Sequence, residues 1–327
     1  MRWLRLVPVD PFILALLATV AVAALLPARG VAATVVSAAT TIAVGLLFFL
    51  YGARIAPRAA LDGARHWRLH VLVMLSTFAL FPLLVLAARA LEPDVLTPAL
   101  YQGLIFLSIV PSTVQSSIAF TSMAHGNVPA AIFSASFSNI AGVVVTPLLA
   151  AGLLTGAGRV GLSAGSITAI VVQLLLPFAA GQLLRPWIGH WLQRHRRVVA
   201  PVDRGSILLV VYSAFSAGVV AGIWRQLSIG RALVLLIVLA LLLAVVLLLT
   251  SLGSRLLGFS WPDQVTAIFC GSKKGMATGL PMAAVLFSHE SVGVIVLPLM
   301  LFHQIQLVVC AALARRWARL SVHPPSN

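Results

Sequence analysis

Two adjacent lysines interrupt an apolar run in the stretch Phe269-Cys270-Gly271-Ser272-Lys273-Lys274-Gly275-Met276-Ala277-Thr278-Gly279. They are the only lysines in the chain, and the other twenty basic residues are arginines. Each glycine in the stretch lowers helix stability by about 1 kcal/mol relative to alanine. Irregular backbone at membrane depth is tolerated only where it is buried in protein or lines a cavity. The stretch therefore predicts a broken helix that forms one half of a binding site.

The rest of the chain has the composition of a multi-pass membrane protein. Of its 327 residues, 61% are hydrophobic and 9% are charged, and several apolar runs reach about 20 residues, the length that spans a bilayer. The net charge of +15 comes from arginines between these runs, where basic residues report membrane orientation. Nucleic-acid binding is therefore not expected. Cys270 and Cys310 fall within predicted helices and indicate packing rather than a disulfide or a metal site.

Apolar runs separated by charges, prolines and glycines predict ten transmembrane helices, of which the fourth and the ninth are interrupted. They are expected near Pro11–Pro27, Ala32–Tyr51, Val71–Leu91, Pro98–Ala124, Val128–Leu154, Ser166–Leu184, Ile207–Trp224, Ala232–Leu252, Asp263–Ser288 and Val292–Ala314. Fifteen arginines then lie on one side of the membrane and five on the other. The excess of arginine predicts that both termini, and the loops Ala53–His70 and Arg185–Gly205, are cytoplasmic.

The ten spans divide into two halves of five within a single transmembrane domain, residues 1–327. Because five is an odd number, the second half enters the membrane inverted, so the sequence predicts inverted repeats over residues 8–156 and 163–316. This is the plan of many secondary transporters, in which interrupted segments at matching positions indicate a site near the bilayer midplane. The fold class expected is an all-α polytopic membrane protein.

The fourth span carries a cluster of polar side chains next to Pro111. Proline removes a backbone donor and disrupts the preceding turn, which leaves room for a site at the break. The candidate binding residues here are Ser112, Thr113, Gln115, Ser116, Ser117 and Thr121. The alternative is that these hydroxyls only form hydrogen bonds between helices, which in membranes contribute about 0.6 kcal/mol each.

Three other spans contribute further candidate residues. They are Ser134, Ser138 and Asn139 in the fifth span, Ser272, Lys273, Lys274 and Thr278 in the ninth, and His303 and Gln304 in the tenth. Gln306 lies close to the last two in the sequence. For the tenth span, buried hydrogen bonds between helices are an equally simple explanation.

All seven acidic residues lie at or near span ends, so the membrane interior holds two lysines and no carboxylate. An unpaired ammonium in the bilayer costs about 2.5–3.5 kcal/mol, so the lysines need water, backbone carbonyls or an anion. Because adjacent residues point to different faces, one lysine can satisfy carbonyls freed by the break while the other reaches a substrate. A hydrolase that uses Ser112 with Lys273 lacks any supporting catalytic or metal motif. We therefore expect no catalytic residues, no resident metal and no enzyme activity.

Two segments resemble the bile acid:sodium symporter superfamily, and in particular its SBF-like branch. They are Pro111–Ser122, followed by Gly126–Val128, and Gly271–Met276, followed by Gly279–Pro281. The resemblance implies two inverted repeats that form a panel domain and a core domain, with the two broken helices crossing in the core. It also implies transport of an organic anion, driven by sodium in the better understood members.

This chain departs from the wider family at the residues implied to bind sodium. That family has a glutamate and a glutamine where the chain has Lys273 and Ala277, and hydroxyl residues where it has Ala131 and Ala135. Replacing a carboxylate with an ammonium disfavours a bound cation, which argues against sodium coupling. The coupling ion, whether sodium, a proton or none, stays open, and no cofactor is expected.

The sequence thus predicts a bacterial inner-membrane secondary transporter that moves a small organic anion by alternating access. Its expected partners are that anion and the lipid bilayer. The alternative is a regulatory membrane protein on the same scaffold without transport of its own. Substrate identity, stoichiometry and oligomeric state stay open.

Overall fold

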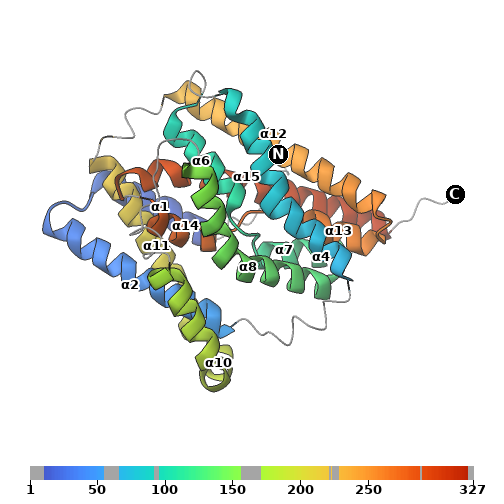
Figure 1. The fold of residues 1–327 in the computed structure, drawn as a ribbon, viewed down its shortest axis with the longest axis horizontal. Coiled ribbons are helices and arrows are strands. Elements are labelled where there is room, and N and C mark those ends of the chain that lie inside the picture. The colour runs from blue at the N-terminus through green and yellow to red at the C-terminus, as the bar shows by residue number, and fades with distance from the viewer. Residues whose placement is uncertain are drawn as a thin grey trace, which may run out of the picture. The chain divides into compact units, whose positions relative to one another are not determined.

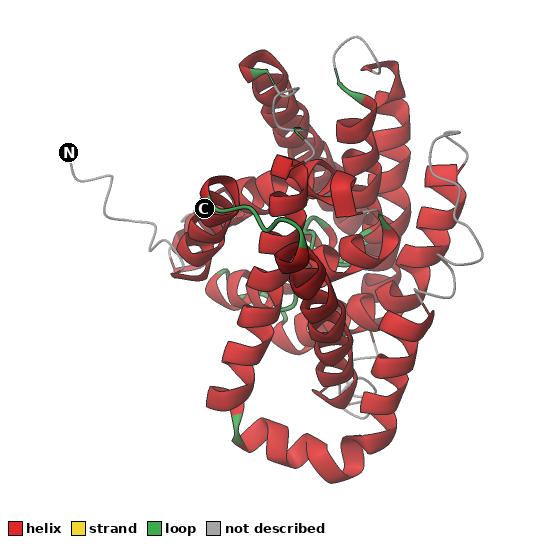
Figure 2. Cartoon of the chain, turned by 90° about the vertical axis from the view of Figure 1, so that its left-hand side faces the viewer, coloured by secondary structure: helices red, strands yellow, loops and turns green. Residues whose placement is uncertain are grey.

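The computed structural model describes residues 11–54, 66–91, 96–155, 171–220, 222, 228–287 and 289–322. All regular secondary structure in this part of the chain is helical (Figure 2). The chain forms two compact units. Unit 1 contains residues 1–55, 162–228 and 280–296, and unit 2 contains residues 56–161, 229–279 and 297–327.

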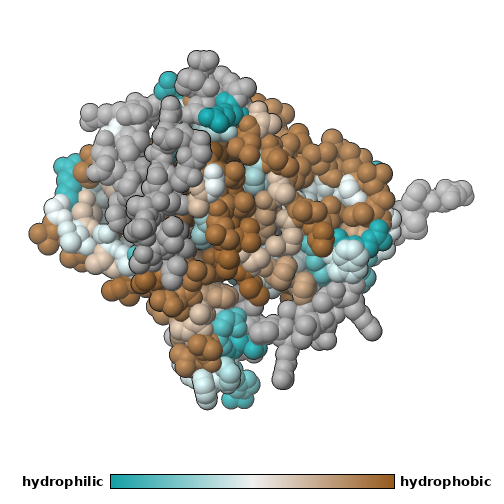
Figure 3. Space-filling model, in the orientation of Figure 1, coloured by the Kyte–Doolittle hydropathy of each residue, from teal (hydrophilic) through white to brown (hydrophobic). Residues whose placement is uncertain are grey.

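Six helices among the described residues are long and apolar enough to cross a membrane. Their outer faces carry large hydrophobic side chains (Figure 3). On α12 (Ile229–Leu256), for example, Leu233, Ile237, Leu241 and Leu248 are each more than half exposed. They recur at intervals of four and seven residues, so they lie on one helix face. A fully apolar exposed face is suited to lipid, and the chain is a multi-pass membrane protein.

Unit 2 contains both of the predicted broken helices. Its elements are α4 (Trp67–Leu75), the π-helix η2 (Ser76–Leu80), α5 (Phe81–Ala87), the 3₁₀-helix η3 (Ala88–Leu91), α6 (Pro98–Ile109), α7 (Gln115–Met123), α8 (Val128–Thr155), α12, α13 (Trp261–Gly271), the first turn of α14 (Met276–Leu286) and α15 (His289–Val322) from Leu297 onward. The fourth predicted span is interrupted between α6 and α7, and the ninth between α13 and α14. Both interruptions therefore lie where the sequence predicts them.

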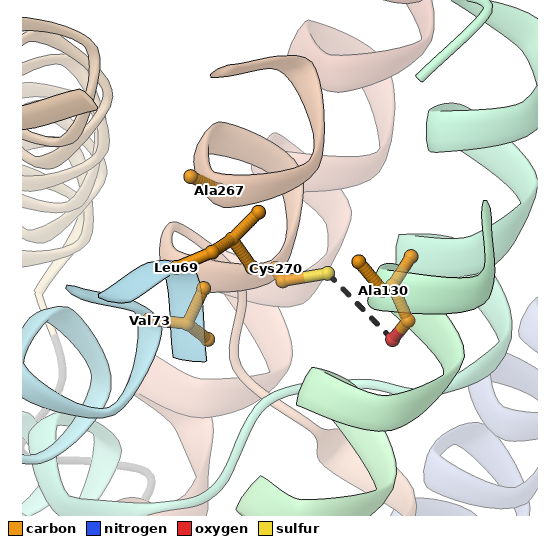
Figure 4. Packing of buried hydrophobic residues seen from close by; sticks show 6 residues of the cluster. Leu69, Val73, Ala130, Ala267 and Cys270 are labelled. Carbon is orange, nitrogen blue, oxygen red and sulfur yellow. Dashed lines mark hydrogen bonds between the residues drawn. The ribbon is translucent and has the colours of Figure 1, made fainter. Parts of the chain in front are cut away.

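Small residues allow α4, α8 and α13 to pack closely in unit 2. Leu69 and Val73 of α4 contact Ala130 of α8 and Ala267 and Cys270 of α13, all of them buried (Figure 4). The Cys270 thiol is also buried and lies 3.9 Å from a backbone oxygen of α8. This contact agrees with the packing role expected for Cys270, and it fixes the end of α13 just before the lysines.

Unit 1 is built on the close crossing of α2 (Val31–Arg54) and α10 (Leu176–Arg194) (Figure 1). A β-carbon at Gly52 would lie 2.1 Å from the Phe178 oxygen, and one at Gly181 would lie 2.1 Å from the Phe49 oxygen. The two helices therefore meet backbone to backbone. The short π-helix η4 (Val171–Leu175) precedes α10.

Two further helices, α1 (Pro11–Leu25) and α11 (Arg196–Val220), complete the described core of unit 1, which also contains Leu280–Val296 from α14 and α15. The Tyr212 hydroxyl of α11 donates to the Leu26 oxygen at 2.8 Å, just after α1. At the end of α2, Arg54 forms a two-point ion pair with Asp203 of α11, at 2.5 and 2.8 Å.

The structure corrects several predicted boundaries. Residues 185–205, expected to be a cytoplasmic loop, are helical except at His195, because α10 continues to Arg194 and α11 already begins at Arg196. The tenth span continues in α15 to Val322 instead of ending near Ala314. Most of the predicted loop at residues 53–70, and the start of the sixth span, lie outside the described residues. The inverted repeats over residues 8–156 and 163–316 stay a prediction.

Candidate functional site

The two breaks in unit 2 contact each other directly. The Gly275 amide donates to the Pro111 oxygen at 2.8 Å, and the Ser112 hydroxyl donates to the Cys270 oxygen at 2.7 Å. A β-carbon at Gly275 would lie 3.2 Å from the oxygens of both Pro111 and Ser112. Glycine at 275 therefore allows the two irregular segments to approach each other. The first break begins at Val110, which is extended (φ −69°, ψ 143°) and ends α6.

Two polar side chains of helix α8 form hydrogen bonds to the backbone of the first break. The Ser138 hydroxyl accepts from the Ser112 amide at 3.1 Å, and the Asn139 amide group donates to the Ser112 oxygen at 2.7 Å. Two of the predicted residues thus satisfy backbone groups that the end of α6 leaves without helical partners. A β-carbon at Gly142, one turn further along, would lie 2.7 Å from the Pro111 ring.

Helix α15 holds the second break in a similar way, through a residue missing from the predicted site. The Gln306 side-chain oxygen accepts from the Lys274 amide at 2.9 Å, and its nitrogen donates to the Lys274 oxygen at 2.9 Å. That nitrogen also lies 2.8 Å from His303 Nδ1. The predicted His303 therefore belongs to this network, whereas the predicted Gln304 is half-buried and joins none of these bonds. The sequence signal for Gln306 was its position among the polar residues of the tenth span.

The Lys274 side chain is fully buried and surrounded by carbonyl oxygens. Its Nζ donates to the oxygens of Thr77, Ser108 and Val110, at 2.7, 2.6 and 2.9 Å. An ammonium has three N–H donors, so this side chain has an acceptor for each. The Phe81 ring lies 4.2 Å from the same nitrogen, a distance at which aromatic faces attract cations.

The Lys273 side chain is also buried but has fewer oxygen partners. Its Nζ donates to the Ser116 oxygen at 2.7 Å and lies 4.0 Å from the centre of the Phe120 ring and 5.1 Å from that of Phe269. One hydrogen bond uses one of its three donors. Among the described residues, neither lysine forms an ion pair with a carboxylate.

Most of the other predicted hydroxyl residues bond within or between helices. The Ser117 hydroxyl donates to the Phe269 oxygen at 3.3 Å, that of Ser272 to the Ile268 oxygen at 2.6 Å, and that of Thr278 to the Gly275 oxygen at 3.4 Å. The Ser134 hydroxyl lies 2.7 Å from Nδ1 of the buried His70, a residue that the sequence did not single out. These contacts match the structural alternative considered for single hydroxyl groups.

The first turn of α7 is the most accessible part of the site, whereas Met276, Thr278 and Gly279 in the first turn of α14 are buried. Gln115 of α7 and Ala277 of α14 are exposed, and the Thr113 and Ser116 hydroxyls, half-buried beside Gln115, are bonded to each other at 2.5 Å. Thr121, further along α7, has a buried hydroxyl without a hydrogen-bond partner among the described residues. The first turn of an α-helix favours nearby negative charge.

No group of three or more His, Cys, Asp or Glu side chains in the described part of the chain could hold a metal ion. Asp263, which precedes the break by two turns, is bonded at 2.8 Å to each of Asn127 and Ser260. The site described here is therefore built from amides, hydroxyls, carbonyls and two ammonium groups.

Comparison with known proteins gives matches over almost the whole chain. A profile of the SBF-like CPA transporter family (DUF4137) matches residues 10–319. The chain is 54% identical to the uncharacterized protein PA2026 of Pseudomonas aeruginosa and 48% identical to the putative symporter YfeH of Escherichia coli, in each case over 95% of this chain and 93% of the relative. It is 28% identical to sodium/bile acid cotransporter 7 of Rattus norvegicus, over 96% of this chain and 94% of that protein.

Proposed function

Because the chain belongs to the SBF-like CPA transporter family, we propose that it carries a small organic anion across the membrane by alternating access. As the sequence predicts, it is a membrane transporter and not an enzyme. The observation that carries the proposal is the contact between two broken helices that enclose Lys273 and Lys274 without a described carboxylate partner. A buried ammonium with a single oxygen partner and no carboxylate, as at Lys273, favours an anionic ligand.

The anion would bind at the first turns of α7 and α14. Gln115 is exposed there, and Lys273 keeps two N–H donors that are not bonded to a described oxygen. The N-termini of α7 and α14 would add positive dipole at these turns. Lys273 would therefore provide the charge that selects an anion. All three N–H donors of Lys274, in contrast, have backbone carbonyl acceptors.

Four broader features belong to the same proposal. The breaks occupy the fourth and ninth spans, and each is held by a side-chain amide from the next span, Asn139 or Gln306. This similarity supports two inverted five-helix repeats that meet at the site. The arginine distribution supports cytoplasmic termini, and the two bacterial relatives support a bacterial inner membrane. We propose transport without sodium at this site, because ammonium groups occupy the break.

The first test is a thermal-unfolding screen of small organic anions on the purified protein, with and without sodium. We expect at least one anion to raise the unfolding midpoint of the wild type without sodium and to have little effect on Lys273→Met. Arg197→Gln is the matched control, because it removes one positive charge from an exposed position on α11 and should leave the response unchanged. An anion response that requires sodium would contradict sodium independence.

The second test is uptake of the same anion by liposomes that contain the protein. We expect uptake driven by a proton gradient, by counter-substrate or by the anion gradient alone. Stabilisation by the anion without uptake under any of these gradients, or under a sodium gradient, would instead support the regulatory alternative.

A further inference from the structure

Three backbone carbonyls in unit 2 lose their helical donors for separate reasons. In the π-helix η2, each amide bonds to the carbonyl five residues earlier, as the bond from Phe81 to Ser76 shows. The residue five positions after Thr77 is Pro82, which has no N–H, so the Thr77 oxygen has no donor in this register. The Ser108 oxygen lies in the last turn of α6, and Val110 lies in the break.

These three oxygens converge on the Lys274 ammonium. Its nitrogen lies 2.7 Å from the Thr77 oxygen, 2.6 Å from that of Ser108 and 2.9 Å from that of Val110, and the site is fully buried. Leaving a buried polar group unsatisfied is destabilising, so one side chain removes this cost for three groups. It also connects η2, the end of α6 and both breaks.

Backbone carbonyls that surround a single positive charge are the ligand set that proteins use for monovalent cations. We propose that the oxygens of Thr77, Ser108 and Val110 form a monovalent-cation site, and that the Lys274 ammonium is its permanently bound cation. The cation that this site requires is then part of the chain itself, and no cation from solution is needed. This consequence for coupling rests on the proposed function, whereas the cation site itself does not.

The test removes the bound cation and returns it as a free molecule. Alanine at 274 keeps the β-carbon, so the missing group corresponds to propylammonium. Buried cavities left by large-to-small substitutions can bind small molecules of matching shape. We expect Lys274→Ala to have a lower unfolding midpoint than the wild type, and propylammonium chloride to restore a substantial part of the loss.

The controls separate a cation site from a general salt effect. Tetramethylammonium chloride at the same ionic strength has no N–H donors and should restore nothing. Lys273→Ala should recover less with propylammonium, because its ammonium has one carbonyl partner instead of three. Equal recovery of the two variants, equal recovery with the two salts, or no recovery of a folded Lys274→Ala would overturn the proposal.

A second pair of variants tests the proposal even if Lys274→Ala does not fold. Glutamine and methionine are similar in length, but only glutamine can donate hydrogen bonds to the carbonyls. We expect Lys274→Gln to unfold at a higher temperature than Lys274→Met. Equal midpoints, or a more stable methionine variant, would mean that the carbonyls do not require a donor. These measurements use no substrate, so a failed anion screen would contradict the proposed function and leave this result unaffected.

Discussion

At the scale of single residues, Gln306 shows how a membrane interior satisfies an irregular backbone. It both accepts from the Lys274 amide and donates to the Lys274 oxygen, so one amide side chain replaces two helical hydrogen bonds. Asn139 serves one carbonyl of the other break. Polar side chains near the breaks therefore hold the irregular backbone in place.

We predict that Gln306→Leu destabilises the protein, because it leaves the buried Lys274 amide unsatisfied and leaves the Lys274 oxygen with only the 3.4 Å contact to His303 Nδ1. An unsatisfied buried group costs about 1–3 kcal/mol, so the midpoint of thermal unfolding should fall below that of the wild type. Gln304→Leu is the matched control, since Gln304 joins none of the bonds to the break, and its midpoint should change little. Similar losses in both variants would contradict the role of Gln306.

The sequence could place polar side chains near the breaks but could not assign their individual roles. His303, Gln304 and Gln306 fall within one helical turn, and which of them faces Lys274 depends on the rotation of α15 against α13. Rotation of a helix is set by packing contacts that are distant in sequence. Because the two lysines are adjacent in the sequence, their side chains could be expected to point to different faces. Only the structure shows that Lys274 is the one bonded to carbonyls.

At the scale of elements, proline and glycine residues predicted the two helix breaks correctly, whereas the pattern of basic residues gave a wrong prediction for one segment. Pro111 and the glycines around Lys273 and Lys274 each disfavour a regular helix, and they coincide with polar side chains inside apolar runs, so both interruptions could be predicted from the sequence. The stretch Arg185–Gly205 was predicted to be a loop because it is basic. Arginine is nevertheless a good helix former, and the structure continues both helices through this stretch up to a single turn at His195.

The crossing of α2 and α10 gives a prediction at the same scale. A β-carbon at Gly52 would lie 2.1 Å from the Phe178 oxygen, and backbone atoms cannot move aside as a flexible side chain can. We expect Gly52→Ala to destabilise the protein by about 1–3 kcal/mol, as overpacking commonly does. The measurement is the midpoint of thermal unfolding in detergent.

Gly45→Ala is the control for this crossing, since it lies on the same helix and changes the same atoms. Its β-carbon would lie 3.8 Å from the nearest atom outside the helix, on Pro177, an ordinary contact. Alanine favours helix by about 1 kcal/mol over glycine, so Gly45→Ala should be neutral or slightly stabilising. If Gly52→Ala were equally tolerated, the close approach of the two helices would be wrong.

At the scale of the whole molecule, each compact unit draws on both halves of the chain. Unit 2 combines residues 56–161 with residues 229–279 and 297–327, and unit 1 combines the remaining segments. Interleaving of this kind accompanies the inverted repeats that we propose, because matching spans of the two halves then share a unit. The arginine distribution separately predicts the membrane orientation of the ten predicted spans.

This orientation can be tested by chemical labelling of single introduced cysteines. Arg29 lies on the side predicted to face away from the cytoplasm, Arg197 lies on the side predicted to be cytoplasmic, and both are exposed. The native Cys270 and Cys310 are buried and should stay unlabelled. We expect a membrane-impermeant maleimide to label Arg29→Cys in intact spheroplasts, and to label Arg197→Cys only after the membrane is opened. The reverse pattern would place the termini outside the cytoplasm, and labelling of both variants in intact spheroplasts would contradict the ten-span topology.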